Sequence, residues 1–175
     1  MKVGLVRHFR VLKDLPDKKW VTSREIAQWF EEYDTADIEI GEVDLFGVDW
    51  QQCYSSDLPR AVGTAQTIYQ GNRIELKELR EFQLNTAAKD NLRLPFILWA
   101  VIVRIRTFAS RKYTSEFEKQ IAGALDEILG KLDENVLIVS HAFTMMFLKK
   151  ELKKRGFKGP EWKRPENGKL YIFER

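Results

Sequence analysis

The stretch Val3-Gly-Leu-Val-Arg-His-Phe9 is a short apolar run that delivers an arginine and a histidine to its end. A second run of the same kind, Val136-Leu-Ile-Val-Ser-His141, ends in the other of the chain's two histidines. Continuous apolar runs of this length are typical of buried parallel strands. In an open α/β sheet, residues just past the carboxyl ends of neighbouring strands meet at one edge, where ligands bind. The sequence therefore predicts that the two histidines come together at that edge.

Strand and helix patterns alternate along the rest of the chain. We expect further strands at residues 51–55, 73–76 and 169–174, with the last at an edge of the sheet. We expect helices at residues 22–33, 58–69, 94–108, 115–132 and 142–155, with loops between them. A strand is the alternative at 94–108, where Ile and Val are frequent. The alternation predicts an α/β fold with three layers, α/β/α, around a mostly parallel sheet with an antiparallel edge strand.

Helix starts and inward faces follow from shorter patterns. Thr22-Ser-Arg-Glu25 and Ser115-Glu-Phe-Glu118 are both capping-box patterns. In the helix after the first box, Trp29 and Phe30 are expected in the core. In the helix that follows His141, helical spacing predicts an inward face, which consists of Phe143, Met146, Phe147 and Leu152.

Length and composition favour one soluble domain over residues 1–175. Hydrophobic residues make up 44% of the chain and charged residues 31%, as in ordinary globular proteins. The single cysteine, Cys53, excludes an intramolecular disulfide, and the N-terminal apolar run is too short for a signal peptide. We therefore expect a cytoplasmic protein that does not enter a membrane. The net charge of +3 is compatible with anionic substrates and is not diagnostic of nucleic acid. The basic cluster at 149–155 fits a solvated helix face, with a nucleic-acid patch as the alternative, so we do not expect nucleic acid as a partner.

Four residues form the candidate site: Arg7, His8, Arg60 and His141. Arg60 falls in the first turn of the helix that follows the strand at 51–55. Two guanidinium groups and two imidazoles make an anion pocket, and paired arginine donors match phosphate oxygens. A neutral imidazole in line with phosphorus is also a competent nucleophile. The two histidines could instead be zinc ligands. A zinc site usually has three or four ligands, however, so we expect no metal.

These segments resemble the signature of the histidine phosphatase superfamily, which is also called phosphoglycerate mutase-like. Leu5-Val-Arg-His-Phe9 looks like its Arg-His-Gly motif, and Ser55-Ser-Asp-Leu-Pro-Arg-Ala-Val-Gly-Thr-Ala65 matches a second motif. Val139-Ser-His-Ala142 matches a third. The resemblance implies that His8 is the phosphorylated nucleophile and that the phosphate is held by a set of groups consisting of Arg7, Arg60, His141 and Ala142. It also makes His141 part of the catalytic machinery.

The family's proton donor is a glutamate in a Leu-x-Glu motif. Leu79-Arg-Glu81 resembles that motif, and Leu76-Lys-Glu78 fits the same short pattern, so Glu81 is expected as the acid and Glu78 is the alternative. The chain also departs from the family. Phe9 stands where glycine is usual, and Ala142-Phe143 stands where Gly-Gly is common. We expect both changes to crowd the mouth of the phosphate pocket.

The resemblance implies a metal-independent phosphatase that hydrolyses phosphomonoesters without a cofactor. A phosphoglycerate mutase-type phosphotransferase and a non-catalytic phosphate-binding regulatory module are the alternatives. The implied partner is a phosphorylated small molecule or a phosphoprotein, with a second copy of the chain as a further candidate. Residues 82–113 correspond to a cap or insert. Within them, residues 94–103 are expected to line an apolar leaving-group pocket or a dimer face, unless they are only core.

Overall fold

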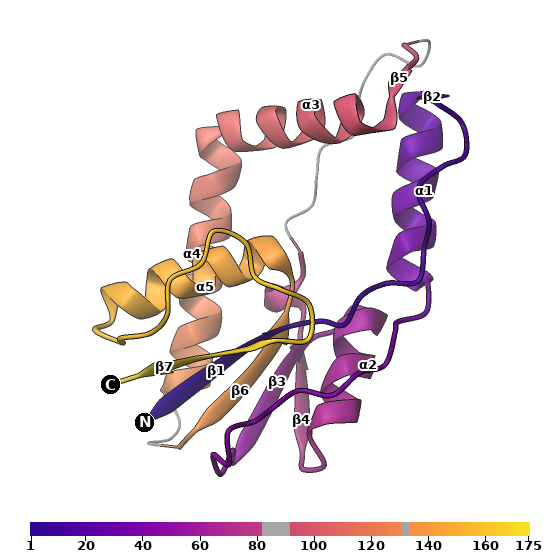
Figure 1. The fold of residues 1–175 in the computed structure, drawn as a ribbon. Coiled ribbons are helices and arrows are strands. Elements are labelled where there is room, and N and C mark those ends of the chain that lie inside the picture. Colours follow the sequence, from indigo (N-terminus) through magenta and orange to yellow (C-terminus); the bar gives the residue numbers. More distant parts are fainter. Residues whose placement is uncertain (82–91, 131–133) are drawn as a thin grey trace.

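The computed structural model describes residues 1–81, 92–130 and 134–175, and a five-stranded sheet lies at its centre (Figure 1). The strands are β1 (Lys2–Arg7), β3 (Gln52–Ser56), β4 (Arg73–Leu76), β6 (Val136–Ser140) and β7 (Leu170–Glu174). Their order is β4-β3-β6-β1-β7. β7 runs antiparallel to β1, and the other three pairs are parallel. The predicted mostly parallel sheet with an antiparallel edge strand is therefore confirmed.

The two apolar runs that end in histidines are neighbours in the sheet. β1 pairs with β6 in parallel, with Leu5 opposite Ile138 and Arg7 opposite Ser140. Gly4 is needed in β1 because a Cβ atom there would lie 2.8–2.9 Å from the side chains of Leu170, Trp50 and Leu137. The shared register brings the ends of both strands to the same level at the carboxyl edge.

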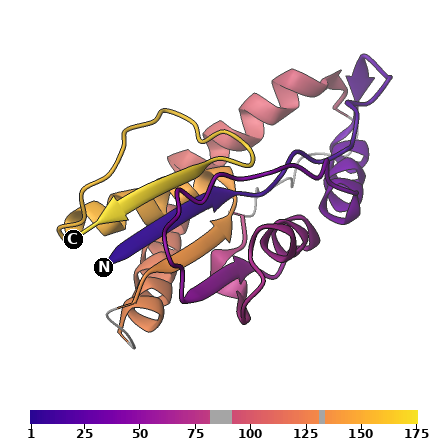
Figure 2. The same cartoon turned by 60° about the horizontal axis from the view of Figure 1, so that its bottom comes forward.

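Helices cover both faces of the sheet, as Figures 1 and 2 show. On one face lie α4 (Arg111–Leu129) and α5 (Ala142–Lys154), and on the other lies α2 (Pro59–Ile68). The side chains of β1 and β6 alternate accordingly. Leu5 and Ile138 pack under α4 and α5, whereas Val6 and Val139 pack in the cluster that contains Ala61 and Ala65 of α2. The structure is thus the predicted three-layer α/β/α sandwich.

A smaller group of elements stands beyond the carboxyl edge of the sheet. It consists of α1 (Ser23–Thr35), α3 (Phe96–Ala109) and the short paired strands β2 (Trp20–Val21) and β5 (Leu94–Pro95). In Figure 1, α3 lies across the top between the far ends of α1 and α4. Val21, Ile26 and Trp99 form a separate small core there, and the Trp99 indole N–H donates to the Val21 carbonyl at 2.8 Å. Residues 82–91, the first part of the expected cap, lie outside the described residues.

The two predicted capping boxes have different outcomes. The Thr22 box is confirmed: Thr22 accepts from the Glu25 N–H, and Glu25 accepts from the Thr22 N–H. The box at Ser115 is wrong, because α4 already begins at Arg111 with Ser110 as its N-cap. Ser115 is therefore an interior residue of the helix.

The predicted inward face of α5 is confirmed at Leu152 and wrong at Met146. Its buried apolar side chains are Met145, Leu148 and Leu152, and Met146 is 41% exposed. The helix starts at Ala142, directly after β6, so the exit of the strand sets its rotation. Phe143 and Phe147 pack only partly buried against the core.

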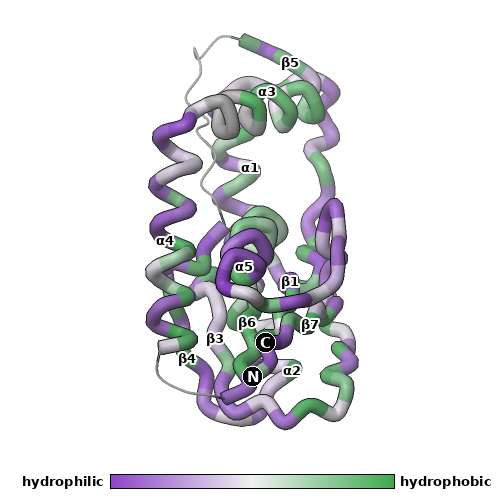
Figure 3. The backbone as a smooth tube through the Cα atoms, turned by 90° about the vertical axis from the view of Figure 1, so that its left-hand side faces the viewer, coloured by the Kyte–Doolittle hydropathy of each residue, from purple (hydrophilic) through white to green (hydrophobic). Residues whose placement is uncertain are grey.

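Two apolar segments are less buried than their sequence suggests. In α1, Trp29 and Phe30 are both only half-buried. Phe30 packs against the small core of Val21, Ile26 and Trp99, whereas Trp29 belongs to no core cluster of the described residues, so the core expectation is wrong for Trp29. In α3, Trp99 is buried, but one side of the helix is exposed, and its side chains are Ile97, Leu98, Val101 and Ile105. The apolar character of α3 is visible in Figure 3. No helix among the described residues is both long enough and apolar enough to cross a membrane.

Candidate active site

His8 follows the last residue of β1 and is 2% exposed. Its backbone N–H donates to the Ser140 carbonyl at 2.9 Å, which ties it to the end of β6. Its side-chain Nδ1 lies 2.6 Å from the carbonyl oxygen of Phe9. A carbonyl only accepts, so Nδ1 carries the ring proton and Nε2 keeps its lone pair. The local backbone thus selects the tautomer that a nucleophilic imidazole needs.

His141 follows β6 and faces His8, with 5.0 Å between the ring centroids. The Arg60 Nε donates to His141 Nδ1 at 3.2 Å. A guanidinium has no acceptor, so His141 carries its proton on Nε2 and donates it to Ser56 Oγ at 2.9 Å. The second histidine is therefore neutral and held from both sides.

Arg60, in the first turn of α2, is 4% exposed. Besides its bond to His141, its Nη1 contacts the Asp34 carboxylate at 2.6 Å, and its guanidinium lies 5.3 Å from the centre of the Tyr33 ring. Asp34 and Tyr33 both belong to the last turn of α1. This helix therefore supplies one wall of the site.

Arg7 is the last residue of β1, and its Nη1 donates to the Pro165 carbonyl at 3.0 Å. Its Nε is buried and has no hydrogen-bond partner within the described part of the chain. Burial and the nearby charge of Arg164 lower the pKa of Arg7. A buried guanidinium N–H without a protein acceptor is suited to an anionic ligand.

Both imidazoles are neutral at pH 7. Burial, and then the positive charge of Arg60, lower the pKa of His8 to about 3, although the Phe9 carbonyl acts in the opposite direction. The same two causes lower the pKa of His141 well below its ordinary value. Desolvation disfavours the charged imidazolium, and adjacent arginines add to the effect. The site thus carries positive charge on its arginines and a free lone pair on His8.

Glu81 lies beside the start of α5, where its Oε1 accepts the Phe143 N–H at 3.2 Å. The segment before it is tied down: the hydroxyls of Ser140 and Thr144 donate to the carbonyls of Leu79 and Arg80 at 2.7 and 2.8 Å. Glu78, the sequence alternative, is exposed, and its carbonyl accepts from Gln120 of α4. Of the two glutamates, Glu81 is therefore the one that contacts the N-terminus of α5. It does so at Phe143, two residues after His141 in the sequence.

Ala142 is the first residue of α5 and directly follows His141. Helix N-termini present free backbone N–H groups and a favourable dipole to anions. The predicted phosphate-binding position of Ala142 is therefore at the same edge as the two histidines. Arg7, His8, Arg60, Glu81 and His141 all lie there as well.

Sequence reasoning missed several residues that build the site. Thr64 accepts the Phe9 N–H at 2.9 Å and donates to the Arg60 carbonyl at 2.7 Å, and Asn167 donates to the His8 carbonyl at 2.7 Å. Thr64 stands in the quoted second motif, which could have indicated it. Tyr33 and Asp34 follow a helical pattern that does not reveal their contact with Arg60.

The Phe9 side chain does not stand at an open pocket mouth. It is 4% exposed, and its ring lies against Gly41 and Gly168. A Cβ atom on Gly168, which has φ +64°, would come within 3.0 Å of that ring. Phe9 is therefore accommodated inside the fold by a neighbouring glycine, and the expected crowding of the mouth by Phe9 is wrong.

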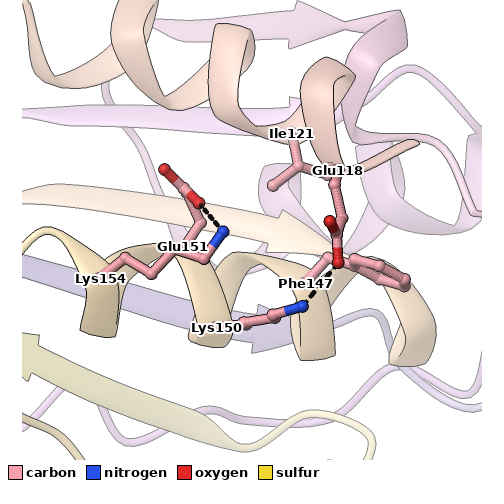
Figure 4. A pocket seen from close by; sticks show the side chains of 6 residues that line it. All are labelled: Glu118, Ile121, Phe147, Lys150, Glu151 and Lys154. Carbon is pink, nitrogen blue, oxygen red and sulfur yellow. Dashed lines mark hydrogen bonds and ion pairs between the residues drawn. The ribbon is translucent and has the colours of Figure 1, made fainter. Parts of the chain in front are cut away.

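A shallow hollow elsewhere lies between α4 and α5 (Figure 4). Its lysines are neutralised locally: Lys150 pairs with Glu118 at 2.6 Å, and Lys154 pairs with Glu151 at 3.1 Å. The basic cluster of α5 is thus a face of paired charges. In residues 1–81, 92–130 and 134–175, no three His, Cys, Asp or Glu side chains gather as a metal-binding group.

A model of the histidine phosphatase superfamily (branch 1) matches residues 42–175, which include Arg60, Glu81 and His141 but not His8. No curated protein sequence matches significantly.

Among solved structures, YhfR from Bacillus stearothermophilus is similar with a TM-score of 0.59 and 16% identity, over 99% of this chain and 90% of that one. The alpha-ribazole phosphatase from Shigella flexneri has a TM-score of 0.56 and 17% identity, over 98% and 89%. The phosphoserine phosphatase from Entamoeba histolytica, in complex with 3-phosphoglyceric acid, has a TM-score of 0.55 and 16% identity, over 99% and 90%. These structures share the fold across nearly the whole chain, including the N-terminal strand outside the family match.

Proposed function

The chain belongs to the histidine phosphatase superfamily, and from this membership and the geometry of its site we propose that it is a metal-independent phosphatase acting through a phosphohistidine. The observation that carries the proposal is the state of His8. Its Nδ1 is committed to the Phe9 carbonyl, and its Nε2 is unprotonated among two arginines and a second histidine. A neutral imidazole in an anion pocket is the arrangement that attack on a phosphate requires.

In the proposed reaction, the phosphate binds to Arg7, Arg60, His141 and the backbone at Ala142. The Nε2 lone pair of His8 forms a bond to phosphorus while the bond from phosphorus to the ester oxygen breaks. Glu81, in its protonated form, gives its proton to the leaving oxygen. The products of this step are an alcohol, a Glu81 carboxylate and a phosphohistidine.

The second step returns the enzyme to its starting state. Water attacks phosphorus and gives a proton to the Glu81 carboxylate, the bond from nitrogen to phosphorus breaks, and inorganic phosphate leaves. Arg60 is held by Asp34 and His141, so the oxyanion charge meets a donor that is already in place. His141 reaches the phosphate by exchanging the bond from its Nε2–H to Ser56 Oγ for a bond to a phosphate oxygen.

The test is phosphate release from aryl, sugar, nucleotide and peptide phosphates with EDTA present, for wild type and His8→Ala. We expect wild-type activity to survive EDTA and His8→Ala to lose it by at least about 10³-fold. Brief incubation with a labelled substrate should leave acid-labile, base-stable phosphate on the wild type and none on the variant. An active His8→Ala protein would contradict the proposal. Phosphate-dependent thermal stabilisation without turnover of any substrate would point instead to a binding module, and transfer to a second alcohol would point to a mutase.

A further inference from the structure

The wall that α1 contributes to the site is a row of aromatic rings. The Tyr33 ring lies 5.3 Å from the Arg60 guanidinium and is stacked on Trp29, with 5.2 Å between centroids and 25° between planes. Trp29 in turn meets Phe96, at the start of α3, edge-on at 4.9 Å. The rings therefore lead from the phosphate arginine to the first turn of α3.

These rings are not ordinary core residues. Neither Trp29 nor Tyr33 packs into any of the three core clusters formed by the described residues, and both are only half-buried. Ile26, on the same helix, is fully buried against the cluster that holds Trp99. The α1 helix thus uses one side for packing and keeps an aromatic side partly accessible.

The ring positions are also fixed. The Trp29 indole N–H donates to the Asp14 carbonyl at 3.0 Å, which orients the ring on which Tyr33 stacks. The Tyr33 ring lies over the guanidinium of Arg60, one of the groups proposed to hold the phosphate. Burial raises the pKa of Tyr33, which keeps its hydroxyl neutral.

We propose that Tyr33 and Trp29 form a leaving-group subsite that selects aryl phosphate monoesters. The inference rests on the proposed function, because it takes the phosphate to bind at Arg7 and Arg60. The Arg60 guanidinium lies 5.3 Å from the centre of the Tyr33 ring, so a phosphate bound to Arg60 brings an aromatic ring on its ester oxygen within reach of the Tyr33 ring. Aromatic pairs contribute beyond simple burial of apolar area, so an aryl group gains more from this wall than an alkyl group of equal size.

Binding of two phosphonates tests the subsite without any turnover. Benzylphosphonate and cyclohexylmethylphosphonate carry the same anion and a ring of similar size, but only the first is aromatic. We expect calorimetric titration to show that the wild type binds benzylphosphonate about 5- to 10-fold more tightly. In Tyr33→Leu and Trp29→Leu, this ratio should fall to about twofold or less.

Two further variants serve as matched controls. Tyr33→Phe keeps the ring and loses only the hydroxyl, so it should keep the wild-type ratio. Phe46→Leu makes an aromatic-to-leucine change at a 62% exposed position in the loop before β3 and should also leave the ratio unchanged. A ratio near one in the wild type overturns the subsite, as does an unchanged ratio in a folded Tyr33→Leu protein. If Tyr33→Leu does not fold, Trp29→Leu is judged by the same criterion.

The phosphonate experiment tests the aryl subsite separately from the proposed phosphatase activity. An inactive protein that prefers benzylphosphonate would retain the aryl subsite and reject the phosphatase, and an active protein without the preference would do the reverse. The aryl group can come from a small molecule or from a tyrosine of a protein. Equal kcat/KM for free phosphotyrosine and for a phosphotyrosyl peptide would indicate a small aryl phosphate, and a higher value for the peptide would indicate a protein.

Discussion

At the scale of single residues, Phe9 contributes to the site through its backbone. Its carbonyl accepts from His8 Nδ1, and its N–H donates to Thr64. Neither contact uses the side chain, so the phosphate site can be built with phenylalanine at this position. The ring needs only a place inside the fold, and Gly168 leaves that space.

The choice between Glu81 and Glu78 can be settled with matched variants. We expect Glu81→Gln to lower kcat for alkyl phosphates by about 10²- to 10³-fold, because the leaving alkoxide then lacks a proton donor. For 4-nitrophenyl phosphate, whose leaving group needs little protonation, the loss should be much smaller. Glu78→Gln should behave like wild type with both substrates, and steady-state kinetics measures all four values. A larger loss in Glu78→Gln would reverse the assignment.

The buried neutral histidines make stability depend on pH. Unfolded His8 has a pKa near 6.5, whereas the folded value is about 3, so a falling pH protonates the unfolded chain first. The stabilisation is complete above pH 6.5 and is lost as pH falls toward 3. At pH 5, His8 alone should lower the free energy of unfolding by about 2 kcal/mol relative to pH 7.5, and His141 acts in the same direction.

Urea titrations at pH 7.5 and 5.0 would measure this effect above the range where carboxylates titrate. His8→Asn serves as the comparison, because it removes one of the two titrating groups and should show a shallower dependence. Equal stability of the wild type at both pH values would mean that the imidazoles are not held neutral.

At the scale of elements, the sequence predicts strands better than helix rotation. An apolar run such as Val136–Ser140 is buried on both faces, so its place in the sheet follows from composition alone. For a helix, the side that faces the core must be predicted as well. In α5 this side is set by the position at which β6 ends and by the hydrogen bond from the Thr144 hydroxyl to the Arg80 carbonyl. Such contacts join residues about 60 positions apart, and local spacing does not contain them.

The same reasoning explains which site residues could be predicted. Arg7, His8, Arg60 and His141 are found from the sequence because each ends a strand, follows one or lies in the first turn of a helix at one edge. Tyr33 and Asp34 are not, since their role depends on how the end of α1 is placed against Arg60. The capping box of Thr22 fixes where α1 starts but not which group its last turn meets.

At the scale of the whole molecule, the sheet and the elements beyond its edge have separate cores. The two clusters on the faces of the sheet contain buried side chains of β1, β3, β6 and β7, and β4 packs against one of them through partly buried side chains. Val21, Ile26 and Trp99 hold α1 and α3 together. Tyr33 and Asp34 reach Arg60 from the end of α1. The small core should therefore determine how the α1 wall is presented to a site that is otherwise built by the sheet.

Two substitutions in α3 compare the buried side of the helix, which forms the small core, with its exposed side. Trp99→Ala removes a fully buried side chain and leaves the Val21 carbonyl without its donor, so it should lower the free energy of unfolding of the α1 and α3 region by about 3 kcal/mol or more. Ile105→Ala changes a side chain of the same helix that is 62% exposed, so it should change this free energy of unfolding by less than about 0.5 kcal/mol.

Hydrogen exchange shows which elements lose stability in Trp99→Ala. With Trp99→Ala, amides of α1 and α3 should exchange faster, while those of β1 and β6 keep their wild-type protection, because the sheet retains both of its own clusters. Faster exchange of β6 to the same extent would show that the small core and the sheet unfold as one unit. In that case α1 could not move without disturbing His8 and His141, and the aromatic wall would be as rigid as the phosphate pocket itself.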